Sequence, residues 1–289
     1  MSRRRLGAKL APYLLILPGW LWLAIFFVIP TLVMLSVSTQ TGDIVSGFQQ
    51  TFHWRTYVEG WNQFHVQFLR SFLYGLIATV LCLTIAYPVA YWIAFRGGTH
   101  KSSLLFLLLL PFFVSFVIRT QSWGFILSDN GMVLSPLKHW HLVAQDFHIL
   151  ATSTAVVGGL VYNFLPFMVL PIYVALERVD PALLEASADL YASSRLAFTK
   201  VVLPLSMPGV FAGVLLTFVP AASDYVNASI LGGAKTTMIG NIIQTEYFTN
   251  LDYPMASALS FILMAVLLVG VFAYARVLGA EDALQMAGA

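Results

Sequence analysis

The sequence predicts an all-α integral membrane protein with six transmembrane helices, and two observations support that prediction. Of the 289 residues, 59% are hydrophobic and only 10% are charged, whereas a soluble domain averages about 45–50% apolar and about 25% charged residues. A chain this poor in charge cannot cover a water-facing surface, so much of its exterior must face lipid. Six stretches are also apolar over the roughly 20 residues that a helix needs to cross the hydrocarbon core.

The predicted spans differ in their local signals. Three arginines at positions 3–5 precede the first span. Its apolar run is longer than the h-region of a signal peptide and no A-x-A-like site closes it, so we expect an uncleaved helix. Pro111 in the third span, and Pro166 and Pro171 in the fourth, predict kinks. The six spans are residues 12–37, 68–95, 103–127, 151–176, 206–230 and 255–278.

The distribution of basic residues predicts the orientation of the chain. Six spans place both termini on one side of the membrane. If that side is the cytoplasm, it receives ten of the 15 Lys and Arg residues and the opposite side receives five, as the positive-inside rule expects. We therefore expect cytoplasmic tails at 1–11 and 279–289, which flank a transmembrane domain at 12–278. The net charge of +2 gives no reason to expect nucleic-acid binding.

The second inner loop, residues 177–205, differs from the rest of the chain because it holds seven charged residues. It predicts two short helices. Asp180 is a typical N-cap and Pro181 suits the first helical position. Ser193 can cap the second helix, which Pro204 should end. From these features alone, an amphipathic loop that lies on anionic headgroups is the competing interpretation.

The same loop resembles the EAA loop of the permease subunits of ATP-binding-cassette (ABC) importers. That pattern consists of Glu-Ala-Ala, a glycine at a fixed spacing and an apolar-x-Leu-Pro ending. Two residues depart from it, because Ser187 replaces an alanine and Tyr191 replaces the glycine. The positions that carry the resemblance are Glu185, Ala186, Ser187, Tyr191, Val201, Leu203 and Pro204.

Other segments resemble the PotB-type permeases of spermidine/putrescine importers, and this resemblance runs from about Leu14 to Leu278. It implies the type I ABC importer (MetI-like) permease fold and the uptake of a polyamine. It also implies a multi-pass location in the bacterial cytoplasmic (inner) membrane. The segments are Phe116–Thr120 with Trp123, Asp129–Gly131, Phe164–Met168 and Lys235–Asn241.

The resemblance further implies partners for the chain. In such permeases a short helix of this loop seats in a groove on the ATPase, so nucleotide-driven closure moves the membrane helices. The implied partners are a homologous second permease subunit (PotC-type), a dimer of ATPase subunits (PotA-type) and a periplasmic or lipid-anchored substrate-binding protein (PotD-type). The chain itself is then no enzyme and holds no metal or cofactor, since ATP and Mg bind to the ATPase. The expected coupling residues are Glu185, Ala186, Ser187, Asp189, Leu190, Tyr191, Leu203 and Pro204, with Leu183 and Leu184 as further apolar contacts.

Arg119 and Asp224 are the ionisable residues that lie deepest in the predicted spans, and both fall in the outer part of the membrane. Charges at that depth pair with one another or face a cavity. A structural Arg119–Asp224 pair is one interpretation. The other assigns Asp224, with Tyr225 and Trp123, to an outer substrate path, because carboxylates and aromatic faces attract ammonium groups. Glu246 in the last outer loop would extend that acidic route.

Two other classes of function are alternatives. A secondary transporter would show acidic residues in several spans or inverted repeats, whereas these spans hold almost no ionisable side chains. An intramembrane enzyme would need a His/Glu metal motif or a nucleophile–base pair, and the sequence shows neither. Gly232–Thr236 superficially resembles a Walker A sequence but does not match its pattern, so we expect the ATPase to be a separate chain. Among ABC permeases, ferric iron, thiamine and other organic cations are the alternative substrates. Gly209 and Gly213 in the fifth span predict close helix packing.

Overall fold

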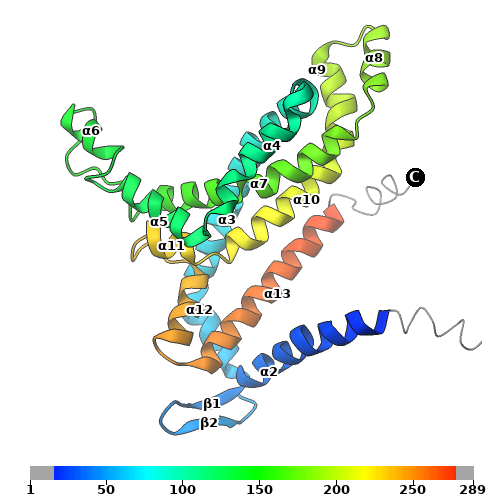
Figure 1. Ribbon diagram of the computed structural model, residues 1–289. Helices are drawn as coiled ribbons and strands as arrows, with labels where there is room; N and C mark the ends of the chain where they lie inside the picture. Colours follow the sequence, from blue (N-terminus) through cyan, green and yellow to red (C-terminus); the bar gives the residue numbers. More distant parts are fainter. Residues whose placement is uncertain (1–15, 278–289) are drawn as a thin grey trace, which may run out of the picture. The chain divides into compact units, whose positions relative to one another are not determined.

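The computed structural model describes residues 16–277, so the predicted tails at 1–11 and 279–289 lie outside the described residues (Figure 1). The chain divides into two compact units. The first comprises residues 16–63 and 243–262, and the second comprises residues 64–242 and 263–277. Each unit is described below by itself.

The first unit begins with a helix over residues 16–37, which includes a π-helical turn at Ala24–Val28 and ends as α2 (Ile29–Val37). An antiparallel hairpin follows, made of β1 (Gln40–Asp43) and β2 (Gly47–Gln50) (Figure 1). The sequence analysis missed this hairpin, because it predicted only a loop here. The carboxylate of Asp43 accepts hydrogen bonds from the backbone N–H groups of Val45 and Ser46 at 2.8 and 2.7 Å, which fixes the turn.

Three further segments complete this unit: the first turns of α3 (Arg55–Arg96), the end of α12 (Ile239–Phe248) and the first half of α13 (Tyr253–Val277). Aromatic rings join the hairpin to α13, since Phe48 lies 5.4 Å from Tyr253 between ring centroids. Gly60 lets α3 approach α13, because a Cβ there would lie 3.0 Å from a methyl carbon of Leu259.

The second unit contains the remaining helices. The third span is broken into α4 (Lys101–Leu109), a 3-10 turn at Leu110–Phe113 and α5 (Phe116–Leu127), and its two parts meet at 88°. The short helix α6 (Leu134–His139) follows, and α7 (Ser153–Glu177) contains Pro166 and Pro171 within one helix. The kink predicted at Pro111 is confirmed as a sharp break in the third span, and the kinks predicted at Pro166 and Pro171 stay predictions.

The second inner loop contains α8 (Pro181–Asp189) and α9 (Ser194–Ala197). A π-helical turn at Phe198–Val202 then leads into α10 (Leu203–Ala222). The prediction that Pro204 ends the second helix is wrong, because the helix continues through this π-helical turn. The wider turn accommodates a proline that can offer no N–H to the preceding turn. The fifth span itself breaks after Ala222, and α11 (Val226–Leu231) follows.

The core of this unit lies where α7 packs against α10 and α3. Met168, Ile172 and Leu176 of α7 are fully buried there. The predicted close packing at the two glycines is confirmed. A Cβ on Gly209 would lie 2.5 Å from the carbonyl oxygen of Pro171, and one on Gly213 would lie 2.8 Å from the sulfur of Met168.

Five helices of the described chain are long and apolar enough to cross a membrane, and the count is six when the two parts of the bent span are taken as one. Their outer surfaces carry large apolar side chains, for example Leu69, Leu76, Phe106 and Phe272. A water-facing surface would not hold so many, so these helices are suited to a lipid environment. The six-span prediction is confirmed with one span bent.

Candidate functional site

The second inner loop is folded by its own capping residues. The side chain of Asp180 accepts a hydrogen bond from the backbone N–H of Ala182 at 2.9 Å and begins α8, with Pro181 at the first helical position. The hydroxyl of Ser193 accepts from the backbone N–H of Leu196 at 3.4 Å and begins α9. Both predicted caps are confirmed. Together they fix two short helices joined by a turn of four residues, 190–193.

Tyr191 lies at the tip of this turn in the left-handed region, with φ of 56°. A glycine adopts that conformation without cost, whereas a residue with a Cβ pays about 1–2 kcal/mol. The turn therefore has the shape that suits a glycine, although tyrosine occupies the position. The tyrosine side chain is 98% exposed and the neighbouring Leu190 is 81% exposed, so both project from the tip.

The residues of α8 divide between an anchoring face and an exposed face. Leu184 packs against the buried cluster formed by α3, α7 and α10, and so attaches the loop to the transmembrane helices. Glu185 and Asp189 are exposed one helical turn apart, and Leu183 is also exposed. Leu184 is half-buried and packs inside this chain, so its contact with a partner stays a prediction.

A second set of predicted residues gathers around the bend of the third span. Arg119 of α5 is only 7% exposed, and its Nη1 donates to the carbonyl oxygen of Pro111 at 2.9 Å. This bond crosses the bend, since Pro111 lies before it and Arg119 after it. The guanidinium carbon lies 4.8 to 5.8 Å from the ring centroids of Phe112, Phe116 and Tyr162, which is the geometry of cation–π contacts.

Arg119 and Asp224 do not form an ion pair, so the predicted direct pair is wrong. Two buried amides connect them instead. Nε of Arg119 donates to Oδ1 of Asn163 on α7 at 3.0 Å, and Nδ2 of Asn163 donates to Oδ1 of Asn227 on α11 at 3.0 Å. Nδ2 and the backbone N–H of Asn227 then donate to Oδ1 of Asp224 at 3.2 and 2.7 Å. The charges are therefore linked through neutral groups, which brings α5, α7 and α11 together.

The remaining residues predicted for the substrate path do not all lie in the same place. Trp123 makes an edge contact with Tyr162, with ring centroids 5.3 Å apart, so it lies beside the Arg119 cluster. Tyr225 is adjacent to Asp224 and is 44% exposed. Glu246 belongs to the other unit, where it accepts a hydrogen bond from Asn250 at 2.9 Å.

The segment 235–241 contacts the junction between α10 and α11. Nδ2 of Asn241 donates to the carbonyl oxygen of Tyr225 at 2.8 Å and to the hydroxyl of Ser229 at 2.6 Å. On the other side, Arg70 of α3 donates to the carbonyl oxygen of Thr237 at 2.8 Å. Gly240 is required by this packing, since a Cβ would lie 2.7 Å from the carbonyl oxygen of Ser223. Asn241 therefore connects this segment to the backbone beside Asp224, and Arg70 connects it to α3.

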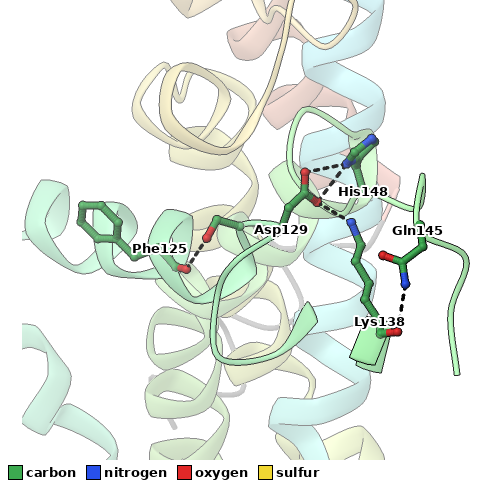
Figure 2. Close-up of polar contacts among 6 residues, drawn as sticks. Phe125, Asp129, Lys138, Gln145 and His148 are labelled. Carbon is green, nitrogen blue, oxygen red and sulfur yellow. Dashed lines mark hydrogen bonds and ion pairs between the residues drawn. The ribbon is translucent and has the colours of Figure 1, made fainter. Parts of the chain in front are cut away.

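The loop at residues 128–150 has its own polar cluster, shown in Figure 2. The carboxylate of Asp129 accepts from Nδ1 of His148 at 2.8 Å and from Nζ of Lys138 at 3.1 Å. Gln145 donates to the carbonyl oxygen of Lys138 at 3.1 Å. These two donors hold the pKa of Asp129 below its ordinary value. The cluster joins the start, the α6 helix and the end of the loop.

Sequence reasoning missed the two asparagines that link Arg119 to Asp224. Asn163 is a strongly polar side chain within the apolar fourth span, and such a residue is expected to hydrogen-bond between helices. Asn227 is the first residue of a formal glycosylation sequon, residues 227–229, and that pattern gives no sign of its structural role. The sequence therefore offered a signal for Asn163. It offered none for the hydrogen bond between Asn163 and Asn227, because that bond depends on how three helices meet.

Comparison with known proteins identifies the family. The family model "Binding-protein-dependent transport system inner membrane component" matches residues 63–279, which contain the EAA-like loop and the Arg119–Asp224 network. The chain belongs to this family. It is therefore a membrane component of a transport system and not an enzyme.

Curated relatives of this permease chain agree with the family match. It is 37% identical over 256 residues to the spermidine/putrescine transport system permease protein PotB of Haemophilus influenzae, which covers 88% of this chain and 90% of the relative. PotB of Escherichia coli is 35% identical, covering 85% of this chain and 90% of the relative. The inner membrane ABC transporter permease protein YdcU of Escherichia coli is 32% identical, covering 75% of this chain and 72% of that one.

Solved structures agree on the fold of the permease. A subunit of a bacterial alginate ABC transporter, solved with an alginate pentasaccharide-bound periplasmic protein, matches with a TM-score of 0.72 at 18% identity, covering 94% of this chain and 96% of that one. A chain of the MetNI methionine ABC transporter matches with a TM-score of 0.57 at 16% identity, covering 74% of this chain and 94% of that one. The MetI-like permease fold predicted from the sequence is thereby confirmed.

Proposed function

We propose that this permease chain forms half of the translocation path of an ABC importer that takes up a polyamine such as spermidine or putrescine. The names of the relatives that share 35–37% of its residues support this substrate class. The observation that carries the proposal is the carboxylate of Asp224. It is only 8% exposed, its Oδ1 bonds Asn227, and Oδ2 has no hydrogen bond to any described residue.

A polyamine suits such a group because it carries several ammonium groups along a flexible apolar chain. A buried carboxylate oxygen can accept a charge-assisted hydrogen bond from an ammonium group. The adjacent ring of Tyr225 is partly exposed and offers an aromatic face, which attracts cations by about 0.5–2 kcal/mol. Trp123 and Arg119 would then line or support this part of the path.

The coupling role is proposed for the loop at 177–205. We propose that this loop couples to a PotA-type ATPase subunit. The coupling residues are Glu185, Ala186, Ser187, Asp189, Leu190 and Tyr191, together with Leu203 and Pro204 at the start of α10. Exposed polar groups and two exposed apolar side chains on a well-capped helix pair support this role. We further propose a PotC-type second permease, a PotD-type binding protein and cytoplasmic termini, which the distribution of Lys and Arg supports.

The test uses the full importer, with all four kinds of subunit reconstituted in lipid vesicles. We expect ATP-dependent uptake of labelled spermidine or putrescine that unlabelled polyamine suppresses and thiamine does not. Asp224→Asn should raise the KM for polyamine about 10- to 100-fold, since a hydrogen bond to a charged group contributes about 1.5–3 kcal/mol.

A matched control is Asp146→Asn, which also removes one carboxylate. Asp146 is exposed in the loop at residues 128–150 and has no hydrogen bond or ion pair within the described residues. The control should transport with an unchanged KM. Uptake of thiamine or ferric iron in place of polyamine would disprove the substrate class, and an unchanged KM in Asp224→Asn would remove Asp224 from the path.

A further inference from the structure

The hydrogen bonds between Arg119 and Asp224 all point in one direction. A guanidinium can only donate and an ionised carboxylate can only accept, so the two ends dictate how the amides between them are oriented. Each amide must accept with its oxygen on the Arg119 side and donate with its nitrogen on the Asp224 side. The three links, at 3.0, 3.0 and 3.2 Å, satisfy this condition.

Burial keeps these orientations fixed. Asn163 is 1% exposed and Asn227 is 0% exposed, so water cannot replace a broken bond. A flipped Asn163 amide would place its NH₂ group against the N–H of Arg119 and leave two donors without acceptors. Within a low-dielectric interior, aligned hydrogen bonds also polarise and strengthen one another. The amides therefore hold one arrangement rather than several.

The arrangement determines which oxygen of Asp224 is available. Oδ1 accepts from both the side chain and the backbone of Asn227, which fixes the plane of the carboxylate. Oδ2 accepts no hydrogen bond from the described residues. The side chain of Asn227 adds a second donor to the backbone bond at Oδ1, and the two donors together restrict rotation of the carboxylate about its bond to Cβ.

We infer that Asn163 and Asn227 are positioning residues, which act through Asp224 by holding its Oδ2 toward a cationic group of the substrate. This inference rests on the proposed role of Asp224 in the polyamine path. It assigns Arg119 a supporting role, as the fixed donor at the other end of this series of hydrogen bonds. A solely structural role for the asparagines, as a clamp between α5, α7 and α11, is the competing explanation.

A double-mutant cycle in the reconstituted importer separates the two explanations. Asn163→Leu removes the link from Arg119 to Asn227 at similar volume. We expect it to raise the KM for spermidine about 5- to 10-fold and to change kcat less than twofold. In an Asp224→Asn background the same substitution should change KM less than twofold, because the group on which it acts is gone. Equal effects in both backgrounds would show that Asn163 does not act through Asp224.

Thr120→Val is the matched control. Thr120 is fully buried and accepts from the same Nδ2 of Asn163 at 3.0 Å. It is not one of the residues that link Arg119 to Asp224 by hydrogen bonds. We expect its KM to stay within twofold of the parent. A KM increase as large as that of Asn163→Leu would indicate general damage to the cluster and would overturn the inference.

Asn163→Asp covers the case in which the leucine variant fails to assemble. The aspartate keeps the volume and the bond to Arg119, but its ionised carboxylate cannot donate to Asn227. The KM effect should again disappear in the Asp224→Asn background, and persistence there would overturn the inference. If Asp224→Asn alone leaves KM unchanged, the proposed function has failed. If it raises KM while both Asn163 variants do not, only the present inference has failed.

Discussion

At the scale of single residues, Tyr191 combines an unfavourable backbone conformation with a fully exposed side chain. Its φ of 56° is one that glycine adopts freely, and its ring has no partner within the described residues. No contact within residues 16–277 compensates the cost of about 1–2 kcal/mol. A contact with another subunit would compensate it, and the exposed Leu190 beside it would enlarge such a contact.

Two substitutions at Tyr191 separate the backbone from the side chain. Tyr191→Ala keeps the left-handed strain and removes the ring, whereas Tyr191→Gly removes both. We expect both variants to bind the ATPase subunit more weakly, with the glycine variant closer to the parent by up to about 1–2 kcal/mol. The measurement is the affinity of the solubilised membrane subunits for the ATPase. Tighter binding by Tyr191→Gly than by the parent would show that the ring makes no useful contact.

At the scale of elements, the order of the loop at residues 128–150 depends on the carboxylate of Asp129. His148 and Lys138 donate to it and lower its pKa from the ordinary value. A carboxyl group whose pKa is lower in the folded state stabilises that state at pH values above the unfolded pKa, about 3.9. The contribution is lost as the pH falls through the lower folded value. The loop should therefore keep its order at neutral pH and lose it in stronger acid.

Hydrogen exchange tests this element. We expect Asp129→Asn to speed amide exchange several-fold in α6 and in residues 140–148 at neutral pH, since the substitution removes the charge that both donors contact. The parent should show the same increase only in acid below the ordinary range of aspartate. Asp146→Asn, in the same loop, should exchange like the parent. Unchanged exchange in Asp129→Asn would show that the cluster does not order the loop.

The sequence predicted features that depend on local patterns. Span positions followed from apolar length, and the caps at Asp180 and Ser193 followed from residue type. The close approach at Gly209 also followed, because only small residues allow it. Pro111 predicted a kink in the third span but not its angle of 88°, because a hydrogen bond from Arg119 crosses the break. The link to Asp224 could not be predicted, because long-range contacts determine it.

At the scale of the whole molecule, the loop and the Asp224 network are connected by packed helices within one unit. Leu184 of α8 lies against the core cluster, which includes Met168 of α7 and Val210 of α10. Gly209 and Gly213 bring α7 and α10 into direct contact, so the two helices are expected to move together. Their 20 to 25 residues span about 30–38 Å. Asn163 lies on α7, and Asp224 follows the end of α10.

This connection gives the last prediction, which concerns Glu185. Its side chain is exposed on α8, next to the anchoring Leu184 in the sequence. Glu185→Lys should therefore leave folding and membrane insertion unchanged, because no described contact is lost. It should reverse a polar contact with the proposed ATPase and lower uptake at least tenfold, a change of about 1.4 kcal/mol or more.

The measurements are ATP-dependent polyamine uptake, membrane insertion and co-purification of the subunits. Asp180→Asn is the matched control, since asparagine caps a helix as well as aspartate does and the substitution removes one charge from the same loop. The control should transport normally. Normal uptake in Glu185→Lys would mean that this face of α8 does not transmit the movement of the ATPase, and the coupling contact would have to lie at Leu190 and Tyr191 alone.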